Sequence, residues 1–262
     1  MQVIRYAWKE WKPVFLTSAG GTVRLFEEEL RFIAGKKRCT GYSRNGKRVE
    51  CPESAEAGES KCGNCMLRDN FFMCVKCTGE ECLNPGRREE CRDEKYFIYL
   101  SAFDSLIKVG ISQSYRLRER LVEQGADFAA RIAEVRDGKT VRLVEQGIAS
   151  LLGITDRVGG AEKHSRIFGD PNASVRGLLS AISRLRNSGF NQHLIRPEIY
   201  DLREYYRLGN VLSRPTAISV EEGTEISGKV TAAKGNILIL ENEGAFLSLN
   251  AHDIIGRTME GI

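Results

Sequence analysis

The chain has 262 residues, of which 42% are hydrophobic and 28% charged, a composition typical of a globular protein with a sizeable core. Its formal net charge of +4 permits a nucleic-acid partner without requiring one. No apolar run approaches the ~20 residues that a membrane-spanning helix needs, and residues 1–8 lack the charged and then apolar profile of a signal peptide. We therefore expect a cytoplasmic protein of one or two domains, with room for a small accessory module and with no membrane partner.

Residues 1–35 are expected to form a β ribbon. Two β-prone runs, residues 14–16 and 22–26, flank the turn sequence SAGG at residues 18–21. A glycine-containing turn between two such runs is a hairpin signal. We expect this first segment to be a structural scaffold.

Residues 36–95 form a second predicted segment, which holds every cysteine of the chain. Cysteines of a cytosolic protein are not expected to pair as disulfides, so this clustering indicates metal binding. Two C-x-x-C pairs occur, and their spacing lets two thiolates of one tight turn reach a single tetrahedral ion. The eight candidate ligands are Cys39, Cys51, Cys62, Cys65, Cys74, Cys77, Cys82 and Cys91.

Eight sulfurs suit two four-cysteine sites. The simplest pairing takes them in chain order, the first four for one ion and the last four for the other, and an interleaved pairing stays open. We favour zinc over an iron–sulfur cluster, because C-x-x-C turns in a polar, glycine-rich segment are its usual setting. Since the segment has few apolar residues, we expect the two zinc ions to be structural and needed for folding.

Residues 96–215 are expected to form a core of strands and helices. Short aromatic and β-branched runs indicate the strands, and apolar residues three or four positions apart indicate the helices. An Asp-Pro pair is a helix-start signal. The expected strands are residues 96–100, 106–111 and 129–135, and the expected helices are residues 114–124, residues 140–152 and one that starts at Asp170-Pro171.

Two of these helices carry candidate site residues. Arg116 and Arg120 lie four residues apart on one stripe of their helix, which is either a solvated basic face or a pair directed at phosphate. Glu145 follows Val141 by four residues and precedes Ile148 by three, so it falls within or beside the apolar stripe of its helix. A carboxylate there is costly unless it is paired or bound to a cation. Both alternatives, an ion-paired glutamate and a metal ligand, stay open.

Residues 216–262 are expected to return to β structure. Three short runs, residues 226–230, 236–240 and 245–249, are separated by turn sequences, which predicts a meander or small barrel with a structural or interdomain role. The predicted fold class is therefore α+β. The predicted domains are residues 1–35 (β ribbon), 36–95 (zinc module), 96–215 (core) and 216–262 (meander or barrel).

The core resembles the GIY-YIG endonuclease superfamily. The resemblance lies in Phe97-Ile98-Tyr99 followed by Lys108-Val109-Gly110, with the arginine helix and the glutamate helix after them in the same order. Phe97 stands where the family has its first glycine, and no late asparagine is identifiable. Lys108 stands where the family has its second tyrosine, and could position a phosphate or a water molecule. The resemblance implies a small GIY-YIG-like sheet with flanking helices, preceded by the two-zinc module and flanked by small β elements at both termini.

The resemblance also implies roles for single residues. Tyr99 would orient or deprotonate the attacking water, and Gly110 stands where a side chain would crowd the site. Arg120, with Arg118 as the alternative, would stabilise charge on the phosphate. Glu145 would hold a single divalent metal ion, Mg²⁺ or Mn²⁺.

More closely, the whole chain resembles a prokaryotic family of unknown function that is related to GIY-YIG proteins. There a cysteine-rich N-terminal segment precedes a stretch like KVGI at residues 108–111, an arginine just before Gln-Gly-Ala, and a later glutamate. Here these are Arg120, Gln124-Gly125-Ala126 and Glu145, and the sequence KGNIL at residues 234–238 is also similar. The overlap covers most of residues 36–250.

We therefore expect a metal-dependent phosphodiesterase of the GIY-YIG endonuclease type, which acts on DNA or RNA and carries structural zinc. The first alternative is a non-catalytic, zinc-containing nucleic-acid-binding protein, associated with RNA or the ribosome, that retains the GIY-YIG fold. The second alternative is a protein–protein adaptor. Nucleic acid is the expected partner, and a protein partner stays open.

Overall fold

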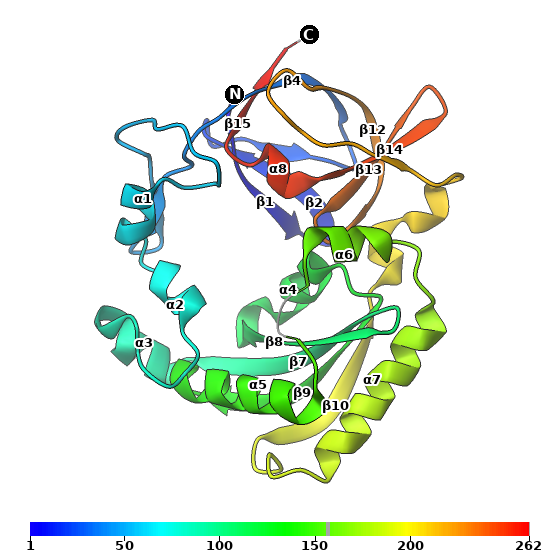
Figure 1. Cartoon of the computed structure of the whole chain (residues 1–262). Helices are drawn as coiled ribbons and strands as arrows, with labels where there is room; N and C mark the ends of the chain where they lie inside the picture. Colours follow the sequence, from blue (N-terminus) through cyan, green and yellow to red (C-terminus); the bar gives the residue numbers. More distant parts are fainter. Residues whose placement is uncertain (156–157, 262) are drawn as a thin grey trace. The chain divides into compact units, whose positions relative to one another are not determined.

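The chain divides into two compact units in the computed structural model, which describes residues 1–155 and 158–261 (Figure 1). Unit 1 consists of Met1–Phe72 and Tyr205–Ile262, and unit 2 of Met73–Glu204. Both units mix helices and strands, so the predicted α+β class is confirmed. The predicted N-terminal and C-terminal β segments both belong to unit 1, whereas the cysteine-rich segment continues from unit 1 into unit 2.

A three-stranded antiparallel sheet opens unit 1. It has the order β1-β2-β3, and Phe15 pairs with Val23 across the predicted hairpin, which is therefore confirmed. Trp8 and Phe15 are among the largest fully buried side chains, so this ribbon contributes to the core of the unit. The strands are β1 (Val3–Lys9), β2 (Lys12–Thr17) and β3 (Thr22–Arg24).

A six-stranded sheet completes the β structure of unit 1, in the order β11-β14-β13-β12-β4-β15. The predicted C-terminal meander is confirmed as β12–β13–β14. Its strand β12 also pairs with β4, which belongs to the predicted N-terminal ribbon, so the two ends of the chain share one sheet. The strands are β4 (Glu29–Lys37), β11 (Thr216–Ala217), β12 (Glu225–Lys234), β13 (Ile237–Asn242), β14 (Ala245–Asn250) and β15 (Arg257–Glu260), with helix α8 (Ala251–Ile254) before β15.

The cysteine-rich segment contains only short elements. A two-stranded hairpin and helix α1 belong to unit 1, whereas η1 and α3 belong to unit 2. Short elements with few buried apolar side chains cannot form a core of their own, which agrees with the expected need for a metal. The elements are β5 (Tyr42–Arg44), β6 (Lys47–Val49), α1 (Gly63–Arg68), α2 (Phe72–Lys76), η1 (Pro85–Arg87) and α3 (Arg88–Asp93).

Unit 2 is built on a four-stranded antiparallel sheet with the order β10-β9-β7-β8. The three predicted strands are confirmed as β7, β8 and β9, and β10 is an additional edge strand. A register shift between Ile98 and Tyr99 marks a bulge in the pairing of β7 with β9. The strands are β7 (Lys95–Phe103), β8 (Leu106–Gln113), β9 (Phe128–Arg136) and β10 (Leu194–Asp201).

Two long helices, α5 (Gly138–Leu152) and α7 (Pro171–Arg186), pack on this sheet and bury its core (Figure 1). The Asp170 side chain caps α7 and Pro171 is its first residue, as predicted. Helix α7 has 16 residues. No helix among the described residues is both long enough and apolar enough to cross a membrane. The other elements are η2 (Ser114–Arg116), α4 (Leu117–Gln124), α6 (Gly160–Ser165), η3 (Arg203–Tyr206) and η4 (Leu208–Asn210).

Strand β7 separates the core from the candidate site. Ile98, Leu100 and Ala102 are buried in the cluster formed with α5 and α7. Because successive residues of a strand point to opposite faces, Tyr99 and Ser101 lie on the other face of the sheet. The apolar pattern of one strand thus fixes where its polar side chains go.

Candidate functional site

The first four cysteines come together in unit 1. The sulfur atoms of Cys39, Cys51, Cys62 and Cys65 all lie within 4.8 Å of one another. Cys39 follows β4, Cys51 follows β6, and the other two stand at the start of α1. Four thiolates at this separation match the ligand set of a closed tetrahedral zinc site. The chain-order grouping of these four cysteines is therefore confirmed.

Hydrogen bonds and burial shape the chemistry of this cysteine centre. The backbone N–H groups of Cys62 and Gly41 donate to Cys39 Sγ, at 3.2 Å and 3.4 Å. Burial and the neighbouring thiols raise the pKa of Cys65, whose side chain is fully buried. Burial also opposes ionisation of Cys51, but hydrogen bonds from the backbone and from nearby thiols outweigh it and lower the pKa of Cys51 to about 7. Since four crowded thiols do not all ionise on their own, a soft divalent cation fits this donor set.

The last four cysteines, all of them described and all in unit 2, do not form such a group. Asn84 Nδ2 donates to Cys74 Sγ at 3.4 Å, and Cys77 Sγ donates to the carbonyl of Glu81 at 3.6 Å. Cys91 packs against the start of α5, where a Cβ atom on Gly138 would lie 2.3 Å from its sulfur. The second four-cysteine zinc site therefore stays a prediction.

The first polar site residue of unit 2 is Tyr99. It pairs directly with Gly110 across β7 and β8. A Cβ atom on Gly110 would lie 2.6 Å from both Cζ and the hydroxyl oxygen of Tyr99, so the far end of the ring occupies the space that a side chain would fill. Glycine at 110 therefore lets the tyrosine lie across β8.

The Tyr99 hydroxyl is fully buried, and no well-aligned hydrogen bond to it is present among the described residues, although the Arg120 guanidinium lies close enough to interact with it. Burial raises its pKa, the nearby Arg120 guanidinium acts in the opposite direction, and the Glu145 carboxylate raises it further. The three side chains thus lie within electrostatic reach of one another, although they come from β7, α4 and α5. With a raised pKa, Tyr99 is a neutral phenol at pH 7, which can donate a hydrogen bond but is a poor base.

Lys108 and Glu145 are both buried at this end of the sheet, with 8% and 7% of their surface exposed. Lys108 Nζ donates to Gln124 Oε1 at 2.9 Å, which ties β8 to the last residue of α4. Glu145 lies among the buried residues of α5, as its position in the apolar stripe predicted. Burying two opposite charges is costly without polar partners, so both side chains belong to a polar site and not to the apolar core.

The two candidate arginines of α4 are placed differently. Arg120 lies near Tyr99, and its Nη1 is 3.6 Å from Glu123 Oε2. Glu123 also pairs with Arg116, at 3.3 Å. Arg118 is exposed, and its charge acts on the Tyr200 hydroxyl on β10. The structure thus brings Arg120, and not Arg118, to the tyrosine.

Lys163 on α6 lies near the same side chains, although no sequence pattern selects it. Burial and the charges of Lys108 and Arg120 lower its pKa to about 8. Its ammonium lies 5.9 Å from the centre of the Phe103 ring. Arg166, which directly follows α6, holds this helix near the end of β7. Its Nη1 atom donates a hydrogen bond to Asp104 Oδ2 at 3.0 Å. Lys163 has no motif or apolar periodicity around it, so only the folded chain reveals it.

Two further buried polar atoms lack partners on the same sheet. Ser101 Oγ and Arg131 Nε, like the Tyr99 hydroxyl, have no well-aligned hydrogen bond among the described residues. Ser101 lies two residues after Tyr99 on β7, and Arg131 is the direct partner of Tyr99 on β9. Leaving a buried polar group unpaired costs about 1–3 kcal/mol. Three such groups on adjacent strands form a buried polar strip within the sheet of unit 2.

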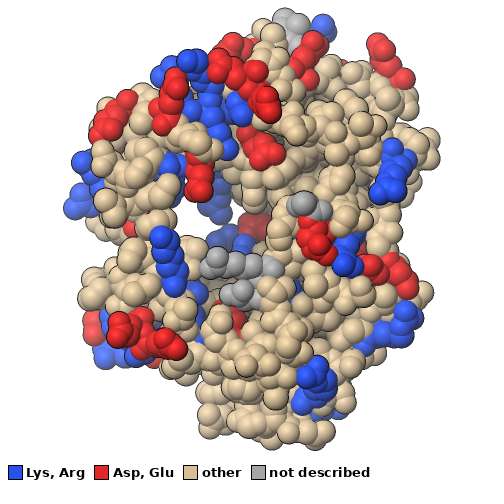
Figure 2. All heavy atoms as spheres, viewed as in Figure 1, with Lys and Arg blue, Asp and Glu red and all other residues tan. Residues whose placement is uncertain are grey.

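The charge on the face seen in Figure 2 is mixed. Lysine and arginine side chains lie interspersed with aspartate and glutamate over the described residues of that face. This agrees with the modest net charge of +4. The described residues of this face therefore form no continuous basic patch.

The chain belongs to a protein family described as "Protein of unknown function (DUF2797)", whose family model matches residues 28–257. Both the cysteine centre and the Tyr99 cluster, which consists of Tyr99, Lys108, Arg120, Glu145 and Lys163, lie within the matched residues. No curated protein and no solved structure gives a significant match to the chain. The comparisons assign no activity, and the resemblance to GIY-YIG nucleases stays a prediction from the sequence.

Proposed function

We propose that this protein is a metal-dependent phosphodiesterase that acts on nucleic acid, with its site at Tyr99, Lys108, Arg120 and Glu145. One observation carries the proposal: a fully buried tyrosine hydroxyl without a well-aligned hydrogen bond lies beside the Arg120 guanidinium and within electrostatic reach of the buried Glu145. Such an arrangement costs stability. A bound ligand that completes these interactions would offset that cost.

The cations of the cluster suit a phosphodiester. Lys108, Arg120 and Lys163 come from β8, α4 and α6, and the charges of Lys108 and Arg120 act on Lys163. Glu123 already pairs with Arg120 at 3.6 Å, and further negative charge beside three cations is still favourable. A phosphodiester supplies such a charge, and the guanidinium can bond two of its oxygens at once. As the phosphorus is attacked, Arg120 would counter the charge that develops on these oxygens.

Tyr99 and Glu145 have separate roles in this proposal. The neutral phenol of Tyr99 would donate a hydrogen bond that orients the attacking water or a phosphate oxygen. Glu145 offers a buried carboxylate, the donor type that Mg²⁺ and Mn²⁺ prefer. A divalent ion bound there would polarise the phosphate and lower the pKa of the attacking water. Gly110 keeps the tyrosine in place by leaving room for its ring.

The cysteine centre has a structural role in the proposal. Four thiolates fill the coordination sphere of zinc and leave no position for a substrate. A zinc ion at Cys39, Cys51, Cys62 and Cys65 would fix the loop that follows β4 and the start of α1 in unit 1. The chemistry is thereby assigned to unit 2.

A nucleic-acid-binding protein without turnover is the second candidate, and one observation favours it. Lys108 stands where GIY-YIG enzymes have a tyrosine, and its ammonium donates to Gln124. An ammonium group has no lone pair with which to take a proton from water. In this alternative the same three cations bind the phosphates, but no hydrolysis follows.

A cleavage assay separates the two candidates. Zinc-loaded protein is incubated with single- and double-stranded DNA and RNA in the presence of Mg²⁺ or Mn²⁺. We expect metal-dependent cleavage that falls by roughly a hundredfold or more in Glu145→Gln. Glu204→Gln, which changes an exposed glutamate of the same unit, is the matched control and should retain full activity.

Binding measurements decide the remaining outcomes. Salt-sensitive nucleic-acid binding without cleavage would establish the second candidate. If the wild-type protein neither cleaves nor binds any of these nucleic acids, both proposals are wrong.

A further inference from the structure

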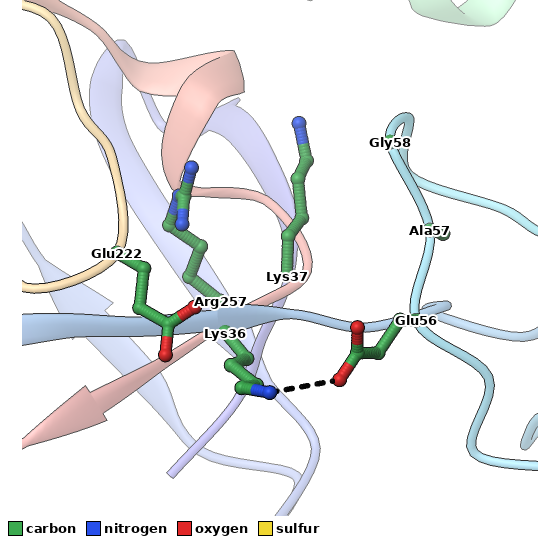
Figure 3. Close-up of a pocket in the computed structure, with 7 residues that line it drawn as sticks. All are labelled: Lys36, Lys37, Glu56, Ala57, Gly58, Glu222 and Arg257. Atoms are coloured by element: carbon green, nitrogen blue, oxygen red, sulfur yellow. Dashed lines mark hydrogen bonds and ion pairs between the residues drawn. The ribbon is translucent and has the colours of Figure 1, made fainter.

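Unit 1 contains a polar hollow of about 400 Å³ that is separate from the cysteine centre (Figure 3). It opens between the end of β4, the loop that joins Cys51 to Cys62, the loop before β12 and the start of β15. Its volume lies within the range of ligand pockets, roughly 300–1,000 Å³. Its lining holds no aromatic or large apolar side chain. A ligand for this hollow must therefore be polar and charged.

Three basic side chains line the hollow, and they differ in their partners. Lys36 Nζ forms an ion pair with Glu56, at 3.2 Å. Among the described residues, Lys37 and Arg257 have no carboxylate within ion-pair distance. Figure 3 shows the side chains of Lys37 and Arg257 extending to the same side of β4, away from the Lys36–Glu56 pair. Two positive charges that form no ion pair with the described residues thus lie on the same side of β4.

Arg257 is held rigidly in this position. Its Nε, Nη1 and Nη2 atoms donate to the backbone carbonyls of Asp253, Gly35 and Val220, at 3.0, 3.1 and 2.9 Å. Carbonyl groups orient the guanidinium without cancelling its charge. Since a guanidinium has five N–H groups, donors remain for a ligand. A preoriented donor loses little entropy when it binds.

Residues 56–58 line the hollow opposite β4, and their backbone is held in place. A Cβ atom on Gly58 would meet nothing within 4 Å, so this part of the hollow is open. The Ala57 N–H donates to the Lys37 carbonyl at 3.2 Å, and Glu56 forms a β-bridge with Arg38. Both ends of the loop are anchored by Cys51 and Cys62. The cysteine centre therefore shapes one wall of the hollow.

We propose that this hollow binds a phosphate group through Lys37 and Arg257. A tetrahedral anion can meet cations from two directions at once, and both side chains are cations without an acidic partner. The phosphate could belong to a free phosphorylated compound or to the backbone of a nucleic acid. Glu222 lines the same hollow with an exposed carboxylate, which opposes anion binding and keeps the affinity modest. The proposal does not depend on the activity of unit 2.

Titration with inorganic phosphate tests the site. Zinc-loaded full-length protein is followed by calorimetry and by the NMR shifts of the Ala57 and Gly58 amides. We expect Lys37→Glu to weaken binding by about fivefold or more, because it turns an attraction into a repulsion. Glu222→Gln should instead tighten binding about twofold. Lys229→Glu, which reverses an exposed lysine on the same sheet, is the control and should bind as the wild type does.

A second variant and a competitor make the result decisive. Phosphate binding that is lost in Arg120→Ala but unchanged in Lys37→Glu would place the anion in unit 2 and overturn the proposal. Amide shifts at Ala57 and Gly58 that stay constant during the titration would overturn it as well. With the site established, a short single-stranded oligonucleotide that displaces phosphate identifies the backbone as the source, and failure to displace it identifies a free phosphorylated compound.

Discussion

The two units each bury a cluster of polar side chains, and the clusters are built in different ways. The cysteine centre of unit 1 has four like ligands from one short stretch, with all sulfurs within 4.8 Å of one another. The Tyr99 cluster of unit 2 takes unlike side chains from β7, β8, α4, α5 and α6. The first cluster follows from local spacing, whereas the second exists only after the sheet and its helices have packed. A cluster whose residues lie close together in the chain can therefore be predicted from the sequence. A cluster whose residues come from distant elements can be identified only in the folded chain.

The clusters also differ in what completes them. A metal ion would compensate the crowded thiols and thereby stabilise unit 1. The Tyr99 hydroxyl is buried without a well-aligned hydrogen bond, so we expect it to destabilise unit 2 in the absence of a ligand. Changes to the cysteine centre should therefore act mainly on folding, and changes to the Tyr99 cluster mainly on ligand chemistry.

Cys65→Ser is expected to have the largest effect. Cys65 is fully buried in the cysteine centre, and structural zinc contributes on the order of 10 kcal/mol to the folding of small zinc modules. Zinc content should fall by one ion per chain, with early thermal unfolding of unit 1. Metal analysis and a thermal melt measure both.

The matched variant Cys77→Ser removes a cysteine of the second set. That set is not gathered into one four-sulfur group in the structure, so this variant should keep the zinc ion of the first site and its melting temperature. An equal loss of zinc in Cys77→Ser would show that the second set also closes around a metal, and would remove the difference between the two sets.

Gly110→Ala is expected to have an intermediate effect, in unit 2. The added Cβ atom would lie 2.6 Å from the Tyr99 ring, so the ring must move. We expect the free energy of unfolding to fall by about 1–3 kcal/mol, together with a loss of nucleic-acid cleavage. Gly189→Ala is the control, because its Cβ atom would meet nothing within 4 Å. Equal urea midpoints for the two variants would mean that the tyrosine does not need the space above Gly110.

Arg88→Ala is expected to have the smallest effect, on the support of the helix that carries Glu145. The Arg88 guanidinium donates two hydrogen bonds to the Asp137 carboxylate, at 2.6 and 3.0 Å. The Asp137 side chain caps the start of α5. Burial opposes ionisation of Asp137, but Arg88 and the backbone N–H of Lys139 outweigh it and hold its pKa below the usual 3.8. The ion pair therefore stabilises the fold fully above pH 3.8 and is lost as the pH falls through the lower pKa of the folded state.

Urea unfolding of the wild type and Arg88→Ala at a series of pH values measures this effect. The difference between their midpoints should be small at pH 7 and should vanish in acid. A difference that grows as the pH falls would contradict the assigned role of Asp137.

Much of the fold could be predicted because local signals are strong in this chain. The SAGG turn identifies the β2–β3 hairpin, and Asp170-Pro171 identifies the start of α7. The C-x-x-C turn at Cys62 and Cys65 identifies part of the metal centre. Each of these signals depends on residues close together in the chain, for which spacing alone sets the geometry.

Contacts between distant residues could not be predicted in the same way. The pairing of β4 with β12 joins the two ends of the chain, and no local pattern records it. Lys163 reaches Lys108 and Arg120 only because α6 is anchored by Arg166 to Asp104. For Glu145, the helical stripe correctly indicated burial, but only the folded chain shows that Tyr99 is its neighbour.

Tyr99→Phe offers the most direct test of the central claim that the buried hydroxyl serves a ligand. Unfolding in urea and nucleic-acid cleavage are measured on the same preparation, with Tyr96→Phe as the control, because the Tyr96 hydroxyl does have a partner, Glu94. We expect Tyr99→Phe to be more stable than the wild type by about 1 kcal/mol and to cleave at least about tenfold more slowly, whereas Tyr96→Phe should be less stable with its cleavage retained. A Tyr99→Phe protein with lower stability and unchanged cleavage would contradict the claim, because the hydroxyl would then serve the fold alone.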